Sequence, residues 1–412
     1  MEEKYPVFTE EMKATHTILL PMMLPIHFTF MKRILDKYGY KTELLTNDSR
    51  DVVNEGLKNV HNDTCYPALL VIGQMLSALK SGKYDTNKVA LMITQTGGGC
   101  RASNYIFLLR KALIKSGFGH VPVISLNFSG LESSPGFKLT VPLLIRLVYA
   151  ILLGDFLMLL CNQCKPYERN KGTTDALVKE WQDIILRSWG DGALISYKKV
   201  RALYPQILEA FAAIKKTGEK KVKVGIVGEI YVKYSPMGNN HLEDFLLAEG
   251  AEAVVPGLID FCLYCIYNNL EDKRLYGGGG VFYRAYKVAY SYFLKKQRHM
   301  LEAIKKHGVF TAPMSFDEIS LLAGKYISHG VKMGEGWLLT VEMAELIEEG
   351  VKNIVCTQPF GCLPNHIVGK GMVNKIKEKH PQANIVTIDY DPGASEINQQ
   401  NRIKMMLANA KL

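Results

Sequence analysis

Eight cysteines are the side chains of this sequence best suited to bind metal or to take part in redox chemistry. They are Cys65, Cys100, Cys161, Cys164, Cys262, Cys265, Cys356 and Cys362. In a small secreted protein an even number of cysteines would indicate disulfides, whereas a large cytoplasmic chain more often uses its thiols for metal or redox chemistry. The position of each cysteine along the chain therefore decides which are candidates.

The stretch TQTGGGCRASN, residues 94–104, places Cys100 directly behind three glycines and just ahead of an apolar segment with helical periodicity. A helix N-terminus has unpaired N–H groups and about half a positive charge, so it lowers the pKa of a thiol and donates hydrogen bonds to sulfur. Glycines let the backbone approach a bulky group without a Cβ clash. The stretch predicts a thiolate held against something large and negative, with Gly98 and Gly99 beside a bound substrate.

Three other cysteines occupy comparable positions. Cys65 precedes a helix that opens with Pro67, Cys356 closes an apolar strand pattern, and Cys362 lies six residues later, ahead of another helix. In a parallel sheet such loops gather at the carboxyl ends of the strands. Soft thiolates from distant loops, without regularly spaced histidines, suit iron and sulfide. We therefore expect the four cysteines of this set, Cys356 included, to be candidate ligands of an iron–sulfur cluster.

The remaining cysteines have simpler interpretations. A buried cysteine often acts as a small hydrophobic residue, and the CxxC pairs at 161/164 and 262/265 lie in apolar helical patterns that favour packing. A zinc ribbon has its two CxxC pairs roughly 15–20 residues apart, whereas 97 residues separate these pairs. Zinc is therefore the second choice of metal.

The hydrophobic pattern predicts an α/β protein with parallel strands and crossover helices. Short apolar runs alternate with helical patterns up to about residue 130, long helical segments follow, and the alternation restarts near residue 221. We expect two similar α/β units with parallel sheets, joined by a helical segment, with ligands at the carboxyl ends of the strands. The predicted parts are an N-terminal α/β domain (1–135), a helical connecting region (136–220) and a C-terminal α/β domain (221–412).

Composition and charge favour a folded cytoplasmic protein. Hydrophobic residues make up 48% of the chain, and 50 Lys and Arg against 40 Asp and Glu give a net charge of +10. The basic residues form short scattered clusters, so we expect no nucleic-acid partner. The mixed, acidic start does not resemble a signal peptide. The apolar stretch 139–161 contains Pro142, Arg146 and Asp155, and we expect it to be a buried helix rather than a membrane span.

Two other side chains are candidates to face the crevice. Glu229 directly follows a strand pattern, and His366 lies in the loop behind Cys362, so we assign both to substrate binding. The chain contains neither a P-loop nor a complete GxGxxG pattern, which makes nucleotide binding an unfavoured interpretation.

Several long segments resemble one family. The segments are TGGGCRASNYI, GEIYVKYSPMGNNHLEDFL, VPGLIDFCLYCIYN, CTQPFGCLPNHIVGKG and IDYDPGASEINQQNRIKMML. Together they resemble the acyl-CoA dehydratase activase-related proteins, a family of 2-hydroxyglutaryl-CoA dehydratase subunits, CoA-substrate-specific enzyme activases and double-cubane cluster proteins. The resemblance extends from roughly residue 60 to the end of the chain.

The resemblance implies an oxygen-sensitive iron–sulfur protein of anaerobes, with a cluster held between paired Rossmann-like domains. In the related dehydratases, an ATP-driven activator of sugar-kinase/actin-like fold passes one electron to the cluster. The electron then reaches a 2-hydroxyacyl-CoA thioester, whose ketyl radical expels the hydroxyl group. This chain lacks the ATPase that is fused ahead of the similar region in longer members. The resemblance therefore implies a separate activator as partner, and by analogy a dimer. Carried over by position, it implies Cys65, Cys100 and Cys362 as the cluster ligands and leaves open whether Cys356 is a fourth.

Three hypotheses about function remain open. The first is a lyase-type component of 2-hydroxyacyl-CoA dehydration, or of a related low-potential reduction, with a 4Fe-4S cluster held by three thiolates and one open iron. The second is a non-catalytic electron carrier or activator with a closed cluster held by four thiolates. The third is a zinc-stabilised structural protein. An eight-iron double-cubane cluster would need further thiols, such as Cys262 or Cys265.

Overall fold

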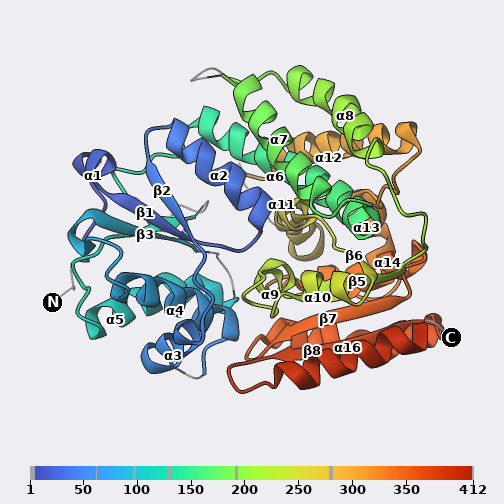
Figure 1. Cartoon of the computed structure of the whole chain (residues 1–412). Helices are drawn as coiled ribbons and strands as arrows, with labels where there is room; N and C mark the ends of the chain where they lie inside the picture. The colour runs from blue at the N-terminus through green and yellow to red at the C-terminus, as the bar shows by residue number, and fades with distance from the viewer. Residues whose placement is uncertain are drawn as a thin grey trace.

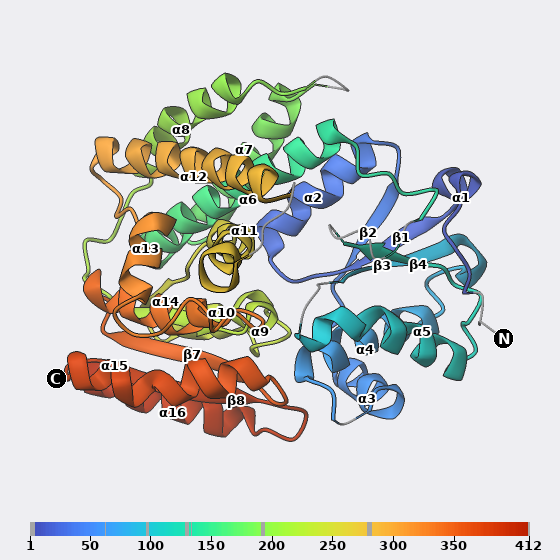
Figure 2. The same ribbon diagram turned by 180° about the vertical axis from the view of Figure 1, so that it is seen from behind.

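The computed structural model of the chain (Figures 1 and 2) describes residues 5–61, 63–95, 99–127, 132, 134–190, 194–277 and 282–410. It contains two four-stranded sheets, and every strand pairing in both is parallel. The prediction of an α/β protein with a parallel sheet in each half is therefore confirmed.

The first sheet lies in the N-terminal half and has the strand order β2-β1-β3-β4. Its strands are β1 (Thr17–Pro21), β2 (Lys41–Leu45), β3 (Val89–Thr94) and β4 (Val123–Leu126). Five of the six residues of β3, VALMIT, are buried, as expected for an inner strand that is covered on both faces. The covering helices are α2 (Pro25–Lys37) on one face and α3 (Arg50–Asn59), α4 (Tyr66–Lys80) and α5 (Tyr105–Lys115) on the other (Figure 1).

The second sheet lies in the C-terminal half and has the equivalent order β6-β5-β7-β8. Its strands are β5 (Val222–Gly228), β6 (Ala251–Val254), β7 (Asn353–Pro359) and β8 (Asn384–Tyr390). Helices α14 (Trp337–Glu348) and α15 (Val373–Lys379) pack on one face, and α10 (Leu242–Ala248) and α16 (Glu396–Ala410) pack on the other. A short helix, α9 (Ile230–Tyr234), follows β5 directly.

A layer of helices lies beside both sheets (Figure 2). It consists of α6 (Val141–Cys164), α7 (Thr173–Ser188), α8 (Tyr197–Ala212), α11 (Leu258–Tyr276), α12 (Phe282–His307) and α13 (Phe316–Ala323). One hydrophobic core joins these helices to α2 and to one face of the first sheet. The segment Val141–Tyr167 is long and apolar enough to cross a membrane, but 67% of its most apolar window is buried inside the protein, as a core helix requires.

Asp155, in the middle of α6, connects this helix to α2 and to α11 through hydrogen bonds. Its two carboxylate oxygens accept hydrogen bonds from the backbone N–H groups of Leu258 and Ile259, each at 2.8 Å, at the start of α11. The same carboxylate contacts His27 Nε2 of α2 at 2.8 Å. A Cβ on Gly154 would lie 2.5 Å from the His27 ring, so a glycine is needed for this close packing.

A second hydrophobic core continues from one sheet to the other. It includes Leu91 and Ile93 of β3, Ile226 of β5 and Val355 of β7. The side of the first sheet that carries α4 and α5 is therefore continuous with the side of the second sheet that carries α10 and α16. The loops that follow the strands of the two halves meet along this shared core.

Candidate functional site

The candidate site is formed by loops at the carboxyl ends of strands from both sheets. Cys100 lies beyond Thr94, where β3 ends, and Cys362 lies beyond Pro359, where β7 ends. Glu229 immediately follows β5. In each sheet the second and third strands in spatial order, β1 and β3 or β5 and β7, flank the point where the strand order reverses. Ligands of open parallel sheets bind at such a point.

Cys65 lies where the backbones of the two halves pack directly on each other. It caps the N-terminus of α4, and the N–H of the next residue, Tyr66, donates to Phe360 O at 3.0 Å. Gly361 has φ +77°, and a Cβ on it would lie 3.0 Å from Cys65 Cα. The backbone of the β7 loop therefore packs directly on Cys65, which places Cys362 beside it.

Cys100 precedes a 3-10 turn, Arg101–Asn104, that leads into α5. Its carbonyl oxygen accepts hydrogen bonds from the backbone N–H of Ser103 at 3.2 Å and from the Ser103 hydroxyl at 2.8 Å. A Cβ on the preceding Gly99 would lie 1.8 Å from Met333 Cε of the C-terminal half. The glycine therefore permits close packing between the Cys100 loop and the segment that leads into α14.

Two buried carboxyl groups lie at the same crevice. Glu229 is 9% exposed, and its Oε2 accepts a hydrogen bond from the N–H of Val232 at 2.9 Å, which caps α9. Glu335 is 7% exposed, and its Oε1 accepts a hydrogen bond from the N–H of Ile230 at 2.9 Å. Both acids therefore bind the same short helix that follows β5.

The three thiols and the two acids influence one another electrostatically. Burial raises the pKa of Cys65, of Cys100 to about 11 and of Cys362, and the charge of Glu229 raises all three further. The charge of Glu335 also raises the pKa of Cys100 and Cys362. Burial, followed by the charge of Glu335, raises the pKa of Glu229 to about 8. The five side chains form one electrostatic group, which we call the thiol crevice.

The helix N-termini lower the pKa of the thiols, as expected, but their effect is smaller than that of burial. Backbone N–H groups of Ala68 and Ala102 lower the pKa of Cys65 and Cys100 respectively. Loss of hydration outweighs them, so the net shift is upward, opposite to the sequence-based expectation. Without a cationic partner these thiols stay protonated near neutral pH.

Tyr105 adds a hydrogen-bonding group to the crevice. It is the first residue of α5, and its hydroxyl and the Cys65 thiol share a hydrogen bond of 2.9 Å. This bond lowers the pKa of Cys65, as does the nearby charge of Arg101, although burial has the larger effect. A phenol hydroxyl at this distance can donate to a thiolate and hold its orientation.

Cys356 does not join the other three cysteines. It lies inside β7, because this strand continues to Pro359 instead of closing at the cysteine. Cys356 is fully buried in the core on the α14 and α15 face, whereas Cys65 belongs to the core on the opposite face. Its thiol lies 3.9 Å from Asn365 Oδ1, and its charged neighbours are Glu342, Asp389 and Lys370.

The residues assigned to substrate binding have separate environments. Gly98 lies outside the described residues, and Gly99 packs against the C-terminal half as described above. The exposed His366 lies in a π-helical turn, Asn365–Gly369, and its ring is hydrogen bonded to the buried Gln358 side chain. The backbone N–H of His366 donates to Cys362 O at 3.2 Å, so this histidine shapes the Cys362 loop.

The two CxxC pairs differ in their surroundings. Cys161 and Cys164 are buried in the core of α6, where the Cys164 thiol lies 3.6 Å from Phe211 O. Cys262 is half-buried in α11, whereas Cys265 is exposed on that helix. Loss of hydration around the thiol, followed by the charge of Glu335, raises the pKa of Cys265. Among the four cysteines of the CxxC pairs, Cys265 is therefore the one whose pKa responds to an acid of the thiol crevice.

Two residues of the site, Glu335 and Tyr105, were not singled out by the sequence analysis. Glu335 lies between Gly334 and Gly336, which both have positive φ values of 59° and 42°. The tetrapeptide MGEG could therefore have indicated Glu335 as a candidate, because two glycines with positive φ impose a tight turn around a single acid. Tyr105 gave no such signal, because an aromatic residue at the start of an amphipathic helix usually belongs to the core.

Within the described ranges, no three His, Cys, Asp or Glu side chains are grouped as ligands of a single metal ion. Thiols of an iron–sulfur cluster bind different iron atoms of one larger body, whereas zinc ligands converge on one atom.

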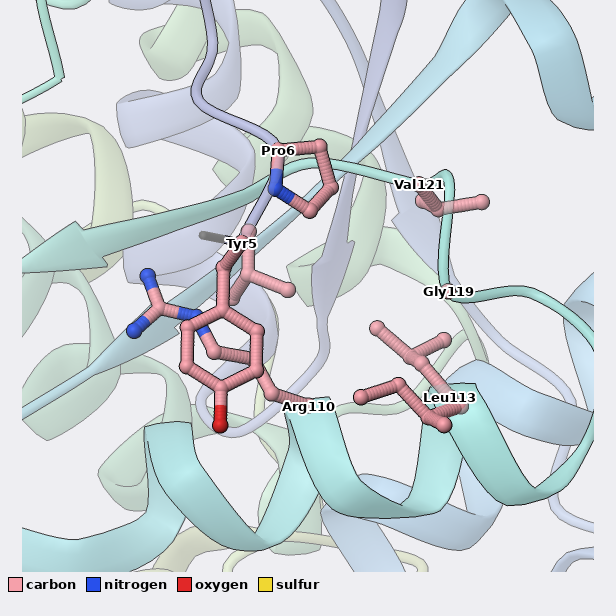
Figure 3. A pocket seen from close by; sticks show the side chains of 8 residues that line it. Tyr5, Pro6, Arg110, Leu113, Gly119 and Val121 are labelled. Atoms are coloured by element: carbon pink, nitrogen blue, oxygen red, sulfur yellow. The ribbon is translucent and has the colours of Figure 1, made fainter. Parts of the chain in front are cut away.

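Two hollows lie away from the thiol crevice. One, of about 10 Å³, lies beside α5 and is lined by Tyr5, Arg110 and Leu113 among others (Figure 3). It has the volume of about one water molecule. The other, of about 220 Å³, lies between α6 and α10 and is lined by Cys161 and Glu243 among others. Neither is lined by Cys65, Cys100 or Cys362.

No protein-family model matches this chain, and no curated protein matches its sequence. The chemistry of the thiol crevice therefore has to be judged from its own residues. These are three soft sulfur donors from three loops, a phenol hydroxyl against one of them, and two buried acids whose pKa is raised by burial.

Proposed function

We propose that this chain is an iron–sulfur protein of the 2-hydroxyacyl-CoA dehydratase system, in which two Rossmann-like halves hold a 4Fe-4S cluster between them. Cys65, Cys100 and Cys362 would be its protein ligands. The cluster, when bound, would supply low-potential electrons for radical dehydration or reduction of an acyl-CoA thioester. The observation that supports this proposal best is the convergence of these three thiols, from three loops of two sheets, in one electrostatic group.

The donor set of the crevice fits a cationic cluster. Two acids and three thiols lie together, and Glu229, Glu335 and Cys65 raise the pKa of other members because no buried cation compensates them fully. Arg101 influences Cys65 from the surface side, and Lys233 influences Glu229. Iron bound among these groups would lower the pKa of the thiols and so stabilise their thiolate forms.

The chain's own residues would position and protonate the reacting groups. The Tyr105 hydroxyl would donate to Cys65 and fix the direction of its sulfur. Glu229 keeps its proton near neutral pH because burial raises its pKa to about 8. Since Glu229 Oε2 accepts from the N–H of Val232, Oε1 is the oxygen that would hold this proton. Such an acid can protonate a departing hydroxyl group, which would otherwise leave as hydroxide.

The position of Cys356 favours the enzyme component over the closed electron carrier. A closed cube needs four thiolates, and Cys356 faces the opposite side of the second sheet from Cys65. Three protein ligands would leave one iron open to a substrate oxygen. We accordingly propose a lyase-type role with an acyl-CoA substrate, a separate ATP-dependent activator of sugar-kinase/actin-like fold as electron donor, and a cytoplasmic location. A dimer belongs to the same proposal.

The test is anaerobic purification of the whole chain, with iron and sulfide quantified per chain and Mössbauer spectra recorded. We expect about four irons and four sulfides, with one iron spectroscopically distinct. Cys100→Ala should abolish cluster content, whereas Cys161→Ala, a change in the core of α6, should leave it intact.

Three results would change the proposal. Equal iron in wild type and Cys100→Ala would overturn the ligand assignment. One zinc and no iron would replace the proposal with the structural alternative. About eight irons would indicate a double-cubane cluster, and Cys265 would then be the first further ligand to test.

A further inference from the structure

The hollow of about 220 Å³ between α6 and α10 is large enough to be a ligand site. Its lining comes from parts of the chain that are far apart in sequence: the loop between β1 and α2, the C-terminal end of α6, the first turn of α7, and α10 with β6. An apolar cavity of about 150 Å³ accepts a benzene molecule. The hollow therefore has room for a ring or a branched carbon chain with a short polar arm.

Apolar side chains make up most of the lining. They include Leu24, Met158 and Ala253, which are buried, and the half-buried Leu247. The buried Cys161 also lines the hollow, and within the described part of the chain its thiol forms no hydrogen bond. Pockets with a lining of this kind bind the apolar body of a small molecule, and a few polar groups fix its orientation.

Glu243 is the ionisable side chain that distinguishes this hollow. Lys165 and Asp175 also line it, but they neutralise each other in an ion pair of 3.0 Å. Asp244 lies at the hollow as well, and its side chain is 69% exposed to water. Among the described residues Glu243 forms no ion pair, although it is only partly accessible to solvent. Its carboxylate therefore lacks both full hydration and a counter-charge.

The oxygen atoms around Glu243 match the donors of an ammonium group. Glu243 Oε2 accepts a hydrogen bond from Asn162 Nδ2 at 3.2 Å. Within the described ranges, Glu243 Oε1 and Asn162 Oδ1 accept no hydrogen bond from the protein. An ammonium group carries N–H donors and no acceptor, so it can donate to both oxygens. Burial raises the pKa of Glu243, and a bound cation would stabilise the charged form that burial disfavours.

A role at the start of α10 does not account for Glu243. Acidic residues in the first turn of a helix usually interact with its unpaired N–H groups. The hydrogen bond of Glu243 instead crosses to α6, and no backbone N–H of the described residues donates to its carboxylate. Asp244 occupies the same first turn and already provides a negative charge there. The carboxylate of Glu243 is therefore directed at the hollow between the two helices.

We propose that this hollow binds a small organic ammonium ion. Its N–H groups would donate to Glu243 Oε1 and Asn162 Oδ1, and its carbon body would lie against Met158, Leu247 and Ala253. The volume fits a primary amine with a body of about six to eight carbon atoms. The site is separate from the thiol crevice, because none of the three crevice thiols lines the hollow. The proposal therefore does not rest on the proposed function.

The test uses the whole chain and a series of probes that share one ring. Benzylamine is a cation at neutral pH, benzyl alcohol is neutral, and benzoate is an anion. Isothermal titration calorimetry should show one benzylamine bound per chain, at least about tenfold more tightly than benzyl alcohol, because hydrogen bonds between charged partners are the stronger ones. Benzoate should not bind, since its charge has the same sign as that of Glu243.

Met158 shows where the probe binds. In a sample with ¹³C-labelled methionine methyl groups, benzylamine should shift the Met158 signal, because this side chain lines the hollow. The signal is identified by its absence from Met158→Leu, a substitution that nearly conserves volume. A benzylamine complex in which other methionine signals shift and that of Met158 does not would overturn the proposal.

Substitutions separate the charge of the site from its shape. Glu243→Gln keeps the length of the side chain and removes its charge, so it should weaken benzylamine binding about tenfold and leave benzyl alcohol binding unchanged. Glu249→Gln is the matched control, because Glu249 follows the same helix, pairs with Lys404 at 3.2 Å and lies outside the lining. Ala253→Val adds methyl groups to the wall and should weaken both probes.

Thermal unfolding of each variant confirms that it is folded before its affinity is compared with that of the wild type. Equal affinities of the wild type for benzylamine and benzyl alcohol would overturn the proposal, as would unchanged benzylamine binding in Glu243→Gln. Failure of all three probes to bind would overturn it too. Absence of iron in the earlier test would overturn the proposed function alone, because this binding requires no cluster.

Discussion

The two sheets have equivalent strand orders but contribute different side chains to the crevice between them. The N-terminal half provides two thiols, Cys65 and Cys100, and a hydroxyl that is hydrogen bonded to one of them. The C-terminal half provides one thiol, Cys362, and both acids, Glu229 and Glu335. The same strand order has therefore placed loops with different side chains at one crevice, because strand order determines where loops lie but not which residues they contain.

The interiors of the two halves differ in the same way. Among the described residues up to 127, no Asp, Glu, Lys or Arg is buried. The C-terminal half buries Glu229, Lys233, Glu335, Glu342 and Glu345 together with further acids. The first half therefore resembles an ordinary apolar core with donor atoms at its edge, whereas the second contains a group of buried ionisable side chains.

The largest expected effect distinguishes two cysteines of one segment. Cys362→Ala should abolish iron binding, because Cys362 lies in the crevice, whereas Cys356→Ala should retain it, because Cys356 faces the other side of β7. Iron and sulfide per chain after anaerobic purification measure both. Loss of iron in both variants would mean that the C-terminal half provides two ligands.

A second comparison tests the charged interior of the C-terminal half. Lys233→Met should lower the free energy of unfolding by about 3–5 kcal/mol, because it leaves buried carboxyls without their shared cation. Lys80→Met removes a partly exposed pair with Glu55 in the N-terminal half and should cost no more than about 1 kcal/mol. Urea unfolding monitored by circular dichroism gives both values. Similar losses would show that the two interiors do not differ electrostatically.

The contact between the halves can be weakened at a single glycine. Gly361→Ala should destabilise the chain by about 1–3 kcal/mol, since φ is +77° and the new methyl group would press on Cys65 Cα. Gly350→Ala is its control, because φ is +87° there but no atom lies within 4 Å. The control variant should lose only the stability that its strained backbone conformation costs, and its iron content should be unchanged. Equal effects of both variants on stability and on iron would remove the inferred packing role of Gly361.

A pH-dependent effect is expected for Asp260, a buried acid of α11. Burial, then the charge of Asp155, raises the pKa of Asp260 to about 8, so the folded chain binds a proton that the unfolded chain loses near pH 4. The wild type should therefore lose stability relative to Asp260→Asn as pH rises from about 4 to 8, by at most about 1.4 kcal/mol per pH unit, with no further change above.

An N-terminal acid should give the opposite sign. The hydrogen bond from Lys83 lowers the pKa of Glu43, so this group stabilises the fold above its unfolded pKa and loses that contribution as pH falls. Glu43→Gln should accordingly differ from the wild type mainly at neutral pH and converge with it in acid. Thermal unfolding across this range decides between the two signs. Parallel curves for both variants would contradict the assignment of the two environments.

Hydrophobic periodicity was sufficient to predict the class of fold. Runs such as VALMIT in β3 and NIVCTQP in β7 have too few polar residues for a half-exposed strand, and strands alternating with helices imply parallel pairing. The end of β7 could not be predicted, because Thr357 and Gln358 are polar yet fully buried. Their side chains bond to Val227 O and to His366, partners that the pattern does not reveal. For this reason Cys356 was expected at a strand end.

The site was predictable only where a residue follows a strand or precedes a helix. Cys100, Cys362 and Glu229 have such positions in the sequence itself. Glu335 is 106 residues from Glu229, and its place in the crevice depends on how α14 packs against β5 and α9. No spacing rule connects two acids brought together by tertiary packing, so this part of the site required the structure.

The contacts of Asp155 bear on the order in which the chain folds during synthesis. Its backbone partner Leu258 is 103 residues further along the chain. At about 5–20 residues per second, a ribosome needs roughly 5–20 s to add them. During that interval α6 has been made, but the N-terminus of α11 that accommodates its carboxylate has not. The part of α6 that packs on α11 therefore stays uncovered until then, although α2, which is made earlier, already packs against another part of it. This exposed apolar surface makes the nascent N-terminal half a candidate client for chaperones and a poor unit for independent expression.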